Sequence, residues 1–89
     1  MISGTVTIVN KLGLHARAAT RLVNCAAAFD AEITLARGTR KINGKSIMGV
    51  LTLAAGLGSE LIVEADGPDE SAALEAITTL FAERFGEEE

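Results

Sequence analysis

A single histidine and a nearby arginine are the residues of this 89-residue chain whose types and spacing best fit chemistry. His15 follows a Gly-Leu pair and precedes an alanine-rich run, and Arg17 lies two positions further on. The apolar spacing after His15 predicts an amphipathic helix over residues 16–28, which places His15 at the start of that helix. The free N–H groups of a first helical turn, together with the helix dipole, form a binding site for an anion.

These surroundings favour uptake of a phosphoryl group by His15. The helix dipole disfavours the imidazolium form, and a neutral imidazole is a nucleophile. The backbone N–H groups of Ala16 and Arg17 and the Arg17 guanidinium would hold the phosphoryl group. The chain has no second histidine, and we find no acid–base pair placed near residue 15 and no nucleotide pocket. We therefore predict a carrier and not an enzyme; a surface or capping His15 and a solvated Arg17 are the simpler alternatives.

Composition narrows the class of protein. Hydrophobic residues make up 48% of the chain, enough for one small domain over residues 1–89, in which we expect 85–89 to be a frayed acidic tail. Cys25 is the only cysteine, which favours a reducing, cytoplasmic compartment and excludes a disulfide or a Cys-rich metal site within the chain. We expect no cofactor and no metal. No apolar run is long enough to span a membrane, and the first residues do not have the pattern of a signal peptide.

Charge is distributed unevenly along the chain. The net charge is −4, yet most of the lysines and arginines lie in the first half and most of the acids lie near the end. A basic half on an acidic protein indicates a local anion site or an acidic partner. Nucleic acid is a weak alternative because the chain has no tryptophan or tyrosine that could stack on bases.

Hydrophobic periodicity predicts strands over residues 2–9, 31–37 and 60–65, and a short strand that ends near residue 42. Besides the helix over 16–28, it predicts a short helix from Ser46 to about residue 53 and a final helix with Pro68 in its first turn. The order is β-α-β-β-α-β-α. This order is typical of a two-layer α+β domain whose antiparallel sheet has one solvated face.

The segment "GKSIMG" at 44–49 is a second candidate site. Ser46 is expected to cap the short helix. If Val50 and Leu53 point inward, then Ile47, Met48 and Leu51 are left partly exposed, either as a satellite of the core or as an apolar docking patch. A P-loop is excluded because it needs four residues between its first glycine and Gly-Lys-Ser, whereas Gly38 and Gly44 enclose five.

Together, "NKLGLHARAAT" and "KINGKSIMGV" resemble the HPr family, the histidine-containing phosphocarriers of the bacterial sugar phosphotransferase system. The resemblance covers nearly the whole chain and implies an open-faced β-sandwich with a four-stranded antiparallel sheet and three helices on one face. It implies that enzyme I, using phosphoenolpyruvate, phosphorylates His15 on its δ1 nitrogen, and that the group then passes to the IIA domain of a sugar permease. Arg17 matches the arginine of the family motif, and Ala18 replaces a common proline, a change that we expect the first turn to tolerate.

The resemblance also implies regulation and a shared docking surface. Ser46 matches the serine that HPr kinase/phosphorylase phosphorylates in some members. We expect a monomer whose partners bind the first two helices transiently. An alternative is a mainly regulatory member, such as a nitrogen-related branch of the same family. The expected docking residues are Ala16, Thr20, Arg21, Lys45, Ile47, Met48 and Leu51.

Overall fold

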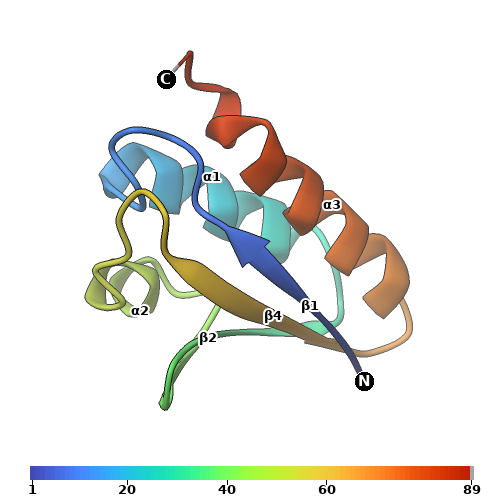
Figure 1. Cartoon of the computed structure of the whole chain (residues 1–89). Coiled ribbons are helices and arrows are strands. Elements are labelled where there is room, and N and C mark those ends of the chain that lie inside the picture. The colour runs from blue at the N-terminus through green and yellow to red at the C-terminus, as the bar shows by residue number, and fades with distance from the viewer. Residues whose placement is uncertain (89) are drawn as a thin grey trace.

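The computed structural model describes residues 1–88, which form four strands and three α-helices in the order predicted from the sequence (Figure 1). The elements are β1 (Ile2–Thr7), α1 (Ala16–Ala27), β2 (Glu32–Arg37), β3 (Arg40–Asn43), α2 (Ile47–Thr52), β4 (Glu60–Asp66) and α3 (Glu70–Ala82), followed by a 3₁₀ turn over Arg84–Gly86. The predicted open-faced β-sandwich of the α+β class is confirmed. No helix among residues 1–88 has the length and apolarity that a membrane span requires.

The sheet has the strand order β1-β4-β2-β3, and each neighbouring pair is antiparallel. In this register Val6 pairs with Leu61, and Leu35 lies opposite both Val63 of β4 and Ile42 of β3. Alternation along the strands buries one side chain in two against the helices. The other face is more open to solvent, as expected for an antiparallel sheet covered on one side.

Two long helices cover the sheet, and each buries the stripe that its sequence predicts (Figure 1). The α1 stripe includes Ala19, Leu22 and Ala26, each of which is fully buried. The α3 stripe is centred on Ile77 and Phe81. Because several side chains on α1 are alanines, this helix can pack closely against the core.

Two element boundaries differ from the sequence predictions by more than one residue. β1 ends at Thr7 and not at residue 9, although the next residue, Ile8, stays buried and pairs through its backbone with Gly58 and Ser59. α3 begins at Glu70, so Pro68 precedes the helix and does not lie in its first turn. The N-cap residue of α3 is Asp69, and its side chain does not cap the helix. Its carboxylate accepts hydrogen bonds from the backbone just before β2 instead, and this contact leaves Pro68 outside the helix.

The expected frayed tail at 85–89 is wrong for its first three residues. Phe85 is 1% exposed and packs edge-on against Phe81, with the ring centroids 4.8 Å apart. Arg84, Phe85 and Gly86 all have positive φ angles, so the chain turns sharply back toward the start of α1 after α3 ends. Burial of the aromatic ring and the contacts of Glu87 described below hold this turn in place. Glu89 lies outside the described residues.

Candidate functional site

His15 is the N-cap residue of α1, as predicted. Its backbone is extended, its carbonyl accepts the N–H of Ala19 at 2.8 Å, and its side chain makes no capping hydrogen bond. The first turn of α1 contains no acidic residue. The backbone dipoles at this end of the helix are therefore left without a side-chain cap, in the arrangement that favours an anion beside the histidine.

The loop before His15 is fixed by backbone contacts. Leu14 donates its N–H to the carbonyl of Ala55 at 2.9 Å, and Gly13 donates to the carbonyl of Asn10 at 3.2 Å. Gly13 has a φ angle of +67°, and a Cβ atom at this position would lie 2.6 Å from the oxygen of Ala55. Glycine is required here both by the left-handed backbone and by the close approach of the 55–56 segment. This loop sets the position of His15 before α1 begins.

The imidazole of His15 is bound by a carboxylate from the other end of the chain. Its Nε2 lies 2.5 Å from Oε2 of Glu87, and the side chains of His15 and Glu87 are 29% and 14% exposed, respectively. The other oxygen of Glu87 accepts a hydrogen bond from the side-chain amide of Asn10 at 2.9 Å. The contact can form because the C-terminal end of the chain and the start of α1 lie at the same end of the molecule (Figure 1).

This contact corrects the sequence analysis, which found no acidic partner for His15. Glu87 is 72 residues away along the chain, and no spacing rule links residues at that separation. The available signal was Phe85, a large apolar residue within an acidic end. A buried ring there implies an anchored tail, and an anchored tail has acids within reach of neighbouring elements.

The hydrogen bonds around Glu87 favour its ionised form. Donation by the Asn10 amide is the main cause that lowers the pKa of Glu87 below the ordinary glutamate value, and the hydrogen bond and charge of His15 act in the same direction. Partial burial opposes this shift in the pKa. Glu87 is therefore a carboxylate, which can only accept hydrogen bonds from its two partners.

Arg17 lies beside this network, in an open hollow of about 470 Å³. The structure gives Arg17 an exposed side chain and no hydrogen bond or ion pair with another described residue. Its guanidinium is consequently available to an incoming anion. The hollow is lined by Lys11, Leu12, Arg17, Arg21, Gly86, Glu87 and Glu88.

Arg21, one of the expected docking residues, is exposed, and its side chain also makes a structural contact. Its guanidinium donates a hydrogen bond to the backbone carbonyl of Phe85 and so ties the second turn of α1 to the C-terminal turn. Thr20, predicted on the same docking surface, is exposed, and its hydroxyl donates to the carbonyl of Ala16 at 2.8 Å. Ala16 is also exposed. The first turn of α1 thus remains open to solvent on the side predicted for docking.

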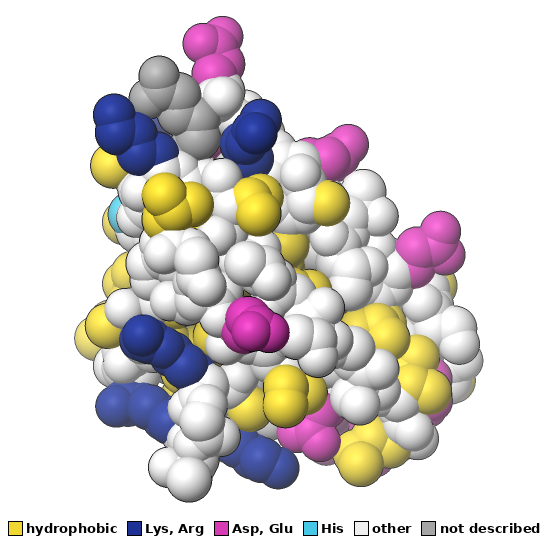
Figure 2. All heavy atoms as spheres, in the orientation of Figure 1, with side chains coloured by type: hydrophobic (Ala, Val, Ile, Leu, Met, Phe, Trp, Pro, Cys, Tyr) yellow, Lys and Arg dark blue, Asp and Glu magenta, His cyan; other side chains and the backbone are white. Residues whose placement is uncertain are grey.

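The second candidate site has the predicted local structure. Ser46 caps α2, and its hydroxyl oxygen accepts the N–H of Gly49 at 3.1 Å. Val50 and Leu53 are buried, whereas Ile47 is 41% exposed and Met48 is 71% exposed. Leu51 is half-buried and packs against the edge of the core. α1 and α2 are in contact, and hydrophobic side chains lie next to the histidine on the molecular surface (Figure 2).

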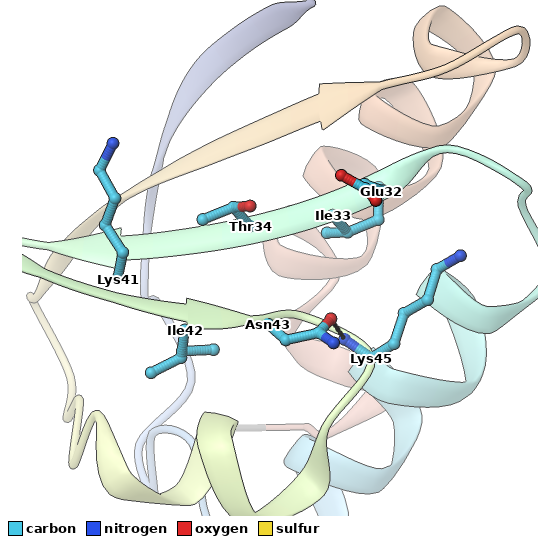
Figure 3. Close-up of a pocket in the computed structure, with 7 residues that line it drawn as sticks. All are labelled: Glu32, Ile33, Thr34, Lys41, Ile42, Asn43 and Lys45. Atoms are coloured by element: carbon cyan, nitrogen blue, oxygen red, sulfur yellow. Dashed lines mark hydrogen bonds between the residues drawn. The ribbon is translucent and has the colours of Figure 1, made fainter.

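Lys45 lies in another hollow, of about 380 Å³, on β2 and β3 (Figure 3). Its Nζ donates to the carbonyl of Phe29 at 2.7 Å, and its backbone N–H donates to Oδ1 of Asn43 at 2.9 Å. Lys45 therefore joins the turn before α2 to the loop that follows α1. Lys41, at the other end of this hollow, forms an ion pair with Glu64 at 3.4 Å.

No group of three or more His, Cys, Asp or Glu side chains within residues 1–88 has the arrangement of a metal site. Cys25 is a free, half-buried thiol whose pKa is raised by burial, so it is a poor nucleophile. The groups that could do chemistry are thus gathered at the start of α1.

Comparison with known proteins identifies the family. A family profile described as "PTS HPr component phosphorylation site" matches residues 2–83. The chain belongs to the HPr family. It is similar to the phosphocarrier protein HPr of Cupriavidus necator, with 49% identity over 89 residues and full coverage of both chains. Family membership gives this chain the general role of a phosphoryl carrier in the phosphotransferase system.

Two further relatives extend this result. The crystal structure of HPr from Thermoanaerobacter tengcongensis superposes with a TM-score of 0.96 at 39% identity and covers all of both chains. The phosphocarrier protein NPr of Shewanella violacea is 49% identical over 82 residues, which is 92% of this chain and 90% of that protein. The HPr fold is therefore shown by structure as well as by sequence.

Proposed function

We propose that this member of the HPr family carries a phosphoryl group on His15, which it accepts from phosphorylated enzyme I and gives to IIA domains of the phosphotransferase system. The observation that carries the proposal is the position of a half-buried histidine as N-cap residue of a helix whose first turn has no side-chain cap. A phosphoryl group bonded to that ring would lie against free backbone N–H groups at the positive end of the helix dipole.

Arg17 and the first turn would stabilise the transferred group. The backbone N–H groups of Ala16 and Arg17, in the uncapped first turn, would donate to phosphoryl oxygens, and the exposed Arg17 guanidinium would pair with two oxygens at once. In phosphoryl transfer most of the catalysis comes from such positioning and charge neutralisation. The partner would supply the phosphoryl group, and this chain would supply a carrier ring and its anion site.

Partner proteins would bind the exposed surface formed by α1 and α2 around His15. Ile47 and Met48 provide apolar contact area, and the basic residues around the hollow attract acidic partners. Because donor and acceptor use the same surface, each complex has to be small and short-lived, and the carrier works as a monomer. The proposed docking residues are those predicted from the sequence, Ala16, Thr20, Arg21, Lys45, Ile47, Met48 and Leu51.

We propose Ser46 as a regulatory phosphorylation site for an HPr kinase/phosphorylase. Ser46 is half-exposed, and its hydroxyl faces the N–H groups of α2, where a phosphate is electrostatically favoured. The added negative charge would leave α2 folded and would repel an acidic partner from the neighbouring apolar residues. A Ser46→Asp variant should therefore be labelled more slowly by enzyme I at unchanged fold, whereas an unchanged labelling rate would count against this role.

Labelling of the purified protein tests the carrier role directly. The protein is incubated with enzyme I and phosphoenolpyruvate and is then mapped by mass spectrometry under alkaline conditions, which preserve phosphohistidine. We expect one phosphoryl group on His15 in the wild type and none in His15→Ala. Arg17→Ala should lower the rate of transfer more than the affinity for enzyme I. Absence of label on His15 with an active donor would end the proposal.

A second candidate function is supported by the similarity to an NPr protein, which has the same identity to this chain as the Cupriavidus HPr. In that case this chain would serve mainly a regulatory branch of the same phosphoryl-transfer system. The two are distinguished by the acceptor, because a sugar carrier should pass its phosphoryl group to IIA domains of sugar permeases, whereas a regulatory carrier should pass it to a IIA protein without a permease.

A further inference from the structure

Proteins that carry a group on histidine must present one ring nitrogen to the donor and keep the other out of the reaction. In this structure the Nε2 atom of His15 is covered by the carboxylate of Glu87 at 2.5 Å. The Asn10 amide, which is fully buried, holds that carboxylate through its other oxygen. Neither Glu87 nor Asn10 belongs to the site residues predicted from the sequence, and the proposed transfer assigns no role to either.

We propose that Glu87, held by Asn10, is a positioning residue that keeps the proton of the neutral His15 ring on Nε2 and leaves the Nδ1 lone pair as the nucleophile. The inference rests on the proposed carrier function and adds to it the group that selects the reacting nitrogen. A carboxylate acts in a similar way in catalytic triads, where it fixes the tautomer and orientation of a histidine.

The direction of each hydrogen bond in this network follows from its chemistry. The Asn10 amide lies 2.9 Å from the carbonyl of Gly13 and 2.9 Å from Oε1 of Glu87. Both partners only accept, so the NH₂ group of Asn10 must face them, and its Oδ1 is the atom left without a partner. The remaining oxygen of Glu87 can then only accept from His15, and Nε2 has to carry the hydrogen.

The transfer step balances with this arrangement. The Nδ1 lone pair forms the bond to phosphorus, while the bond between phosphorus and the donor atom breaks and its electron pair leaves with the donor. The proton stays on Nε2 throughout, so the ring gains positive charge as the bond forms. Glu87 compensates that charge through its hydrogen bond to Nε2, and the reverse step on a IIA partner returns the ring to its neutral Nε2–H form.

The backbone conformation of the C-terminal turn places the Glu87 carboxylate beside His15. Three consecutive residues, Arg84, Phe85 and Gly86, have φ angles of 57°, 55° and 78°. Two of them are not glycine, and a left-handed conformation at such residues is unfavourable by about 1–2 kcal/mol each unless the surroundings enforce it. The buried ring of Phe85 and the Arg21 guanidinium on the Phe85 carbonyl enforce it here.

A Glu87→Gln variant tests the proposal because it keeps the shape and changes the hydrogen bonding. The Asn10 amide would donate a hydrogen bond to the side-chain oxygen of the new glutamine. The NH₂ group of that glutamine would then donate toward Nε2, which would have to accept with its lone pair. The proton would move to Nδ1. The matched control is Glu75→Gln, which removes the same charge from an exposed residue of α3 outside the hollow. Glu87→Ala provides a second variant, in which neither nitrogen is fixed.

Two readouts separate positioning from a structural effect. The ¹⁵N spectrum of the His15 ring reports which nitrogen carries the hydrogen at a pH where the ring is neutral. Chemical phosphorylation with potassium phosphoramidate, a small donor that needs no docking surface, reports which nitrogen reacts. We expect the wild type and Glu75→Gln to show Nε2–H and Nδ1-phosphohistidine. We expect Glu87→Gln to show the opposite tautomer and a fraction of protein that is phosphorylated on Nε2. Transfer from enzyme I should also be slower, with kcat lowered at least about tenfold and KM little changed.

The outcomes also separate this proposal from the proposed function. An unchanged tautomer and an unchanged site of phosphorylation in Glu87→Gln and Glu87→Ala would overturn the role of Glu87, even with a wild type that is labelled normally by enzyme I. If enzyme I does not label the wild type while the tautomer still switches, the carrier function fails and the assignment of Glu87 to the ring proton stands.

Discussion

The guanidinium of Arg21, on the second turn of α1, donates a hydrogen bond to the backbone carbonyl of Phe85, 64 residues further along the chain. This bond connects the helix that carries His15 to the turn that carries Glu87. It makes the C-terminal residues part of the histidine site, because the side chain of Glu87 can reach the ring only while the turn is held against α1.

Replacing Arg21 should loosen the tail with little loss of overall stability. In Arg21→Met the apolar stem remains and the hydrogen bond to Phe85 is lost, so we expect the free energy of unfolding to fall by about 1 kcal/mol. The NMR signals of the His15 ring should move toward those of Glu87→Ala. Arg17→Met is the control for stability, since the structure gives Arg17 no such bond to another described residue. Identical ring signals in Arg21→Met and wild type would show that the bond does not hold the tail.

Removing the Phe85 ring should have a much larger effect on stability. The ring is 1% exposed and packs against Phe81, so Phe85→Ala should lower the free energy of unfolding by about 3–5 kcal/mol in chemical denaturation. Phe29→Ala, at a half-buried ring, is the control and should cost less. Phe85→Leu should recover most of the loss, because a leucine fills much of the same space. Equal losses in Phe85→Ala and Phe29→Ala would contradict the burial of the tail.

Local patterns explain why most of the fold could be predicted from the sequence. The α1 stripe of Ala19, Leu22, Val23 and Ala26 has helical spacing, and all four residues are buried. Ser46 has the side chain and the position of an N-cap, and it caps α2. These features depend on residues within a few positions of each other. The resemblance to the HPr family then fixed the arrangement of the elements, which periodicity alone left open.

Contacts between distant residues explain what the sequence could not predict. The pairing of Glu87 with His15 spans 72 residues and depends on where the α3 helix ends. The start of α3 differs from the prediction for a related reason. The carboxylate of Asp69 binds backbone N–H groups before β2, and Pro68 therefore lies outside the helix. Rules that predict helix starts use only neighbouring residues, so they do not account for a side chain that binds a distant segment.

The contact of Asp69 with the backbone should stabilise the fold. Its carboxylate accepts the N–H groups of Asp30 and Ala31, each at 2.8 Å, and donation by Asp30 is the main cause that lowers the pKa of Asp69. Asp69→Asn places an NH₂ group against one of these donors and should lower the melting temperature. Asp66→Asn, whose side chain is 63% exposed, should change it little. Equal shifts in melting temperature would contradict the assigned role.

The glycine before the histidine motif should be needed for the position of the ring. Gly13 and Gly38 both have left-handed backbones, with φ angles of 67° and 61°. Alanine at either position is unfavourable by about 1–2 kcal/mol for the backbone alone. A Cβ at Gly13 would also lie 2.6 Å from the oxygen of Ala55, whereas one at Gly38 would have nothing within 4 Å. Gly13→Ala should therefore be the less stable variant in denaturation and should shift the His15 ring signals, while Gly38→Ala should leave those signals in place.

Acid should release Glu87 from His15. Donation by Asn10, aided by His15, holds the pKa of Glu87 below its ordinary value. Because the folded-state pKa is depressed, the stabilisation by the bound carboxylate is complete above the ordinary glutamate pKa and is lost as the pH falls through the lowered value. Above that pH range the contact should persist for the neutral and the protonated ring alike, since both donate from Nε2.

A titration of the Glu87 carboxyl carbon by NMR measures this pKa in three proteins. We expect the wild type to have the lowest pKa, His15→Ala to have a slightly higher one, and Asn10→Ala to have the highest, because the Asn10 amide is the larger cause of the shift. The His15 ring signals of the wild type should change in the same acid range as the Glu87 carboxyl carbon. A pKa in Asn10→Ala as low as that of the wild type would show that the amide does not hold the carboxylate, and the network that selects Nδ1 would lose its support.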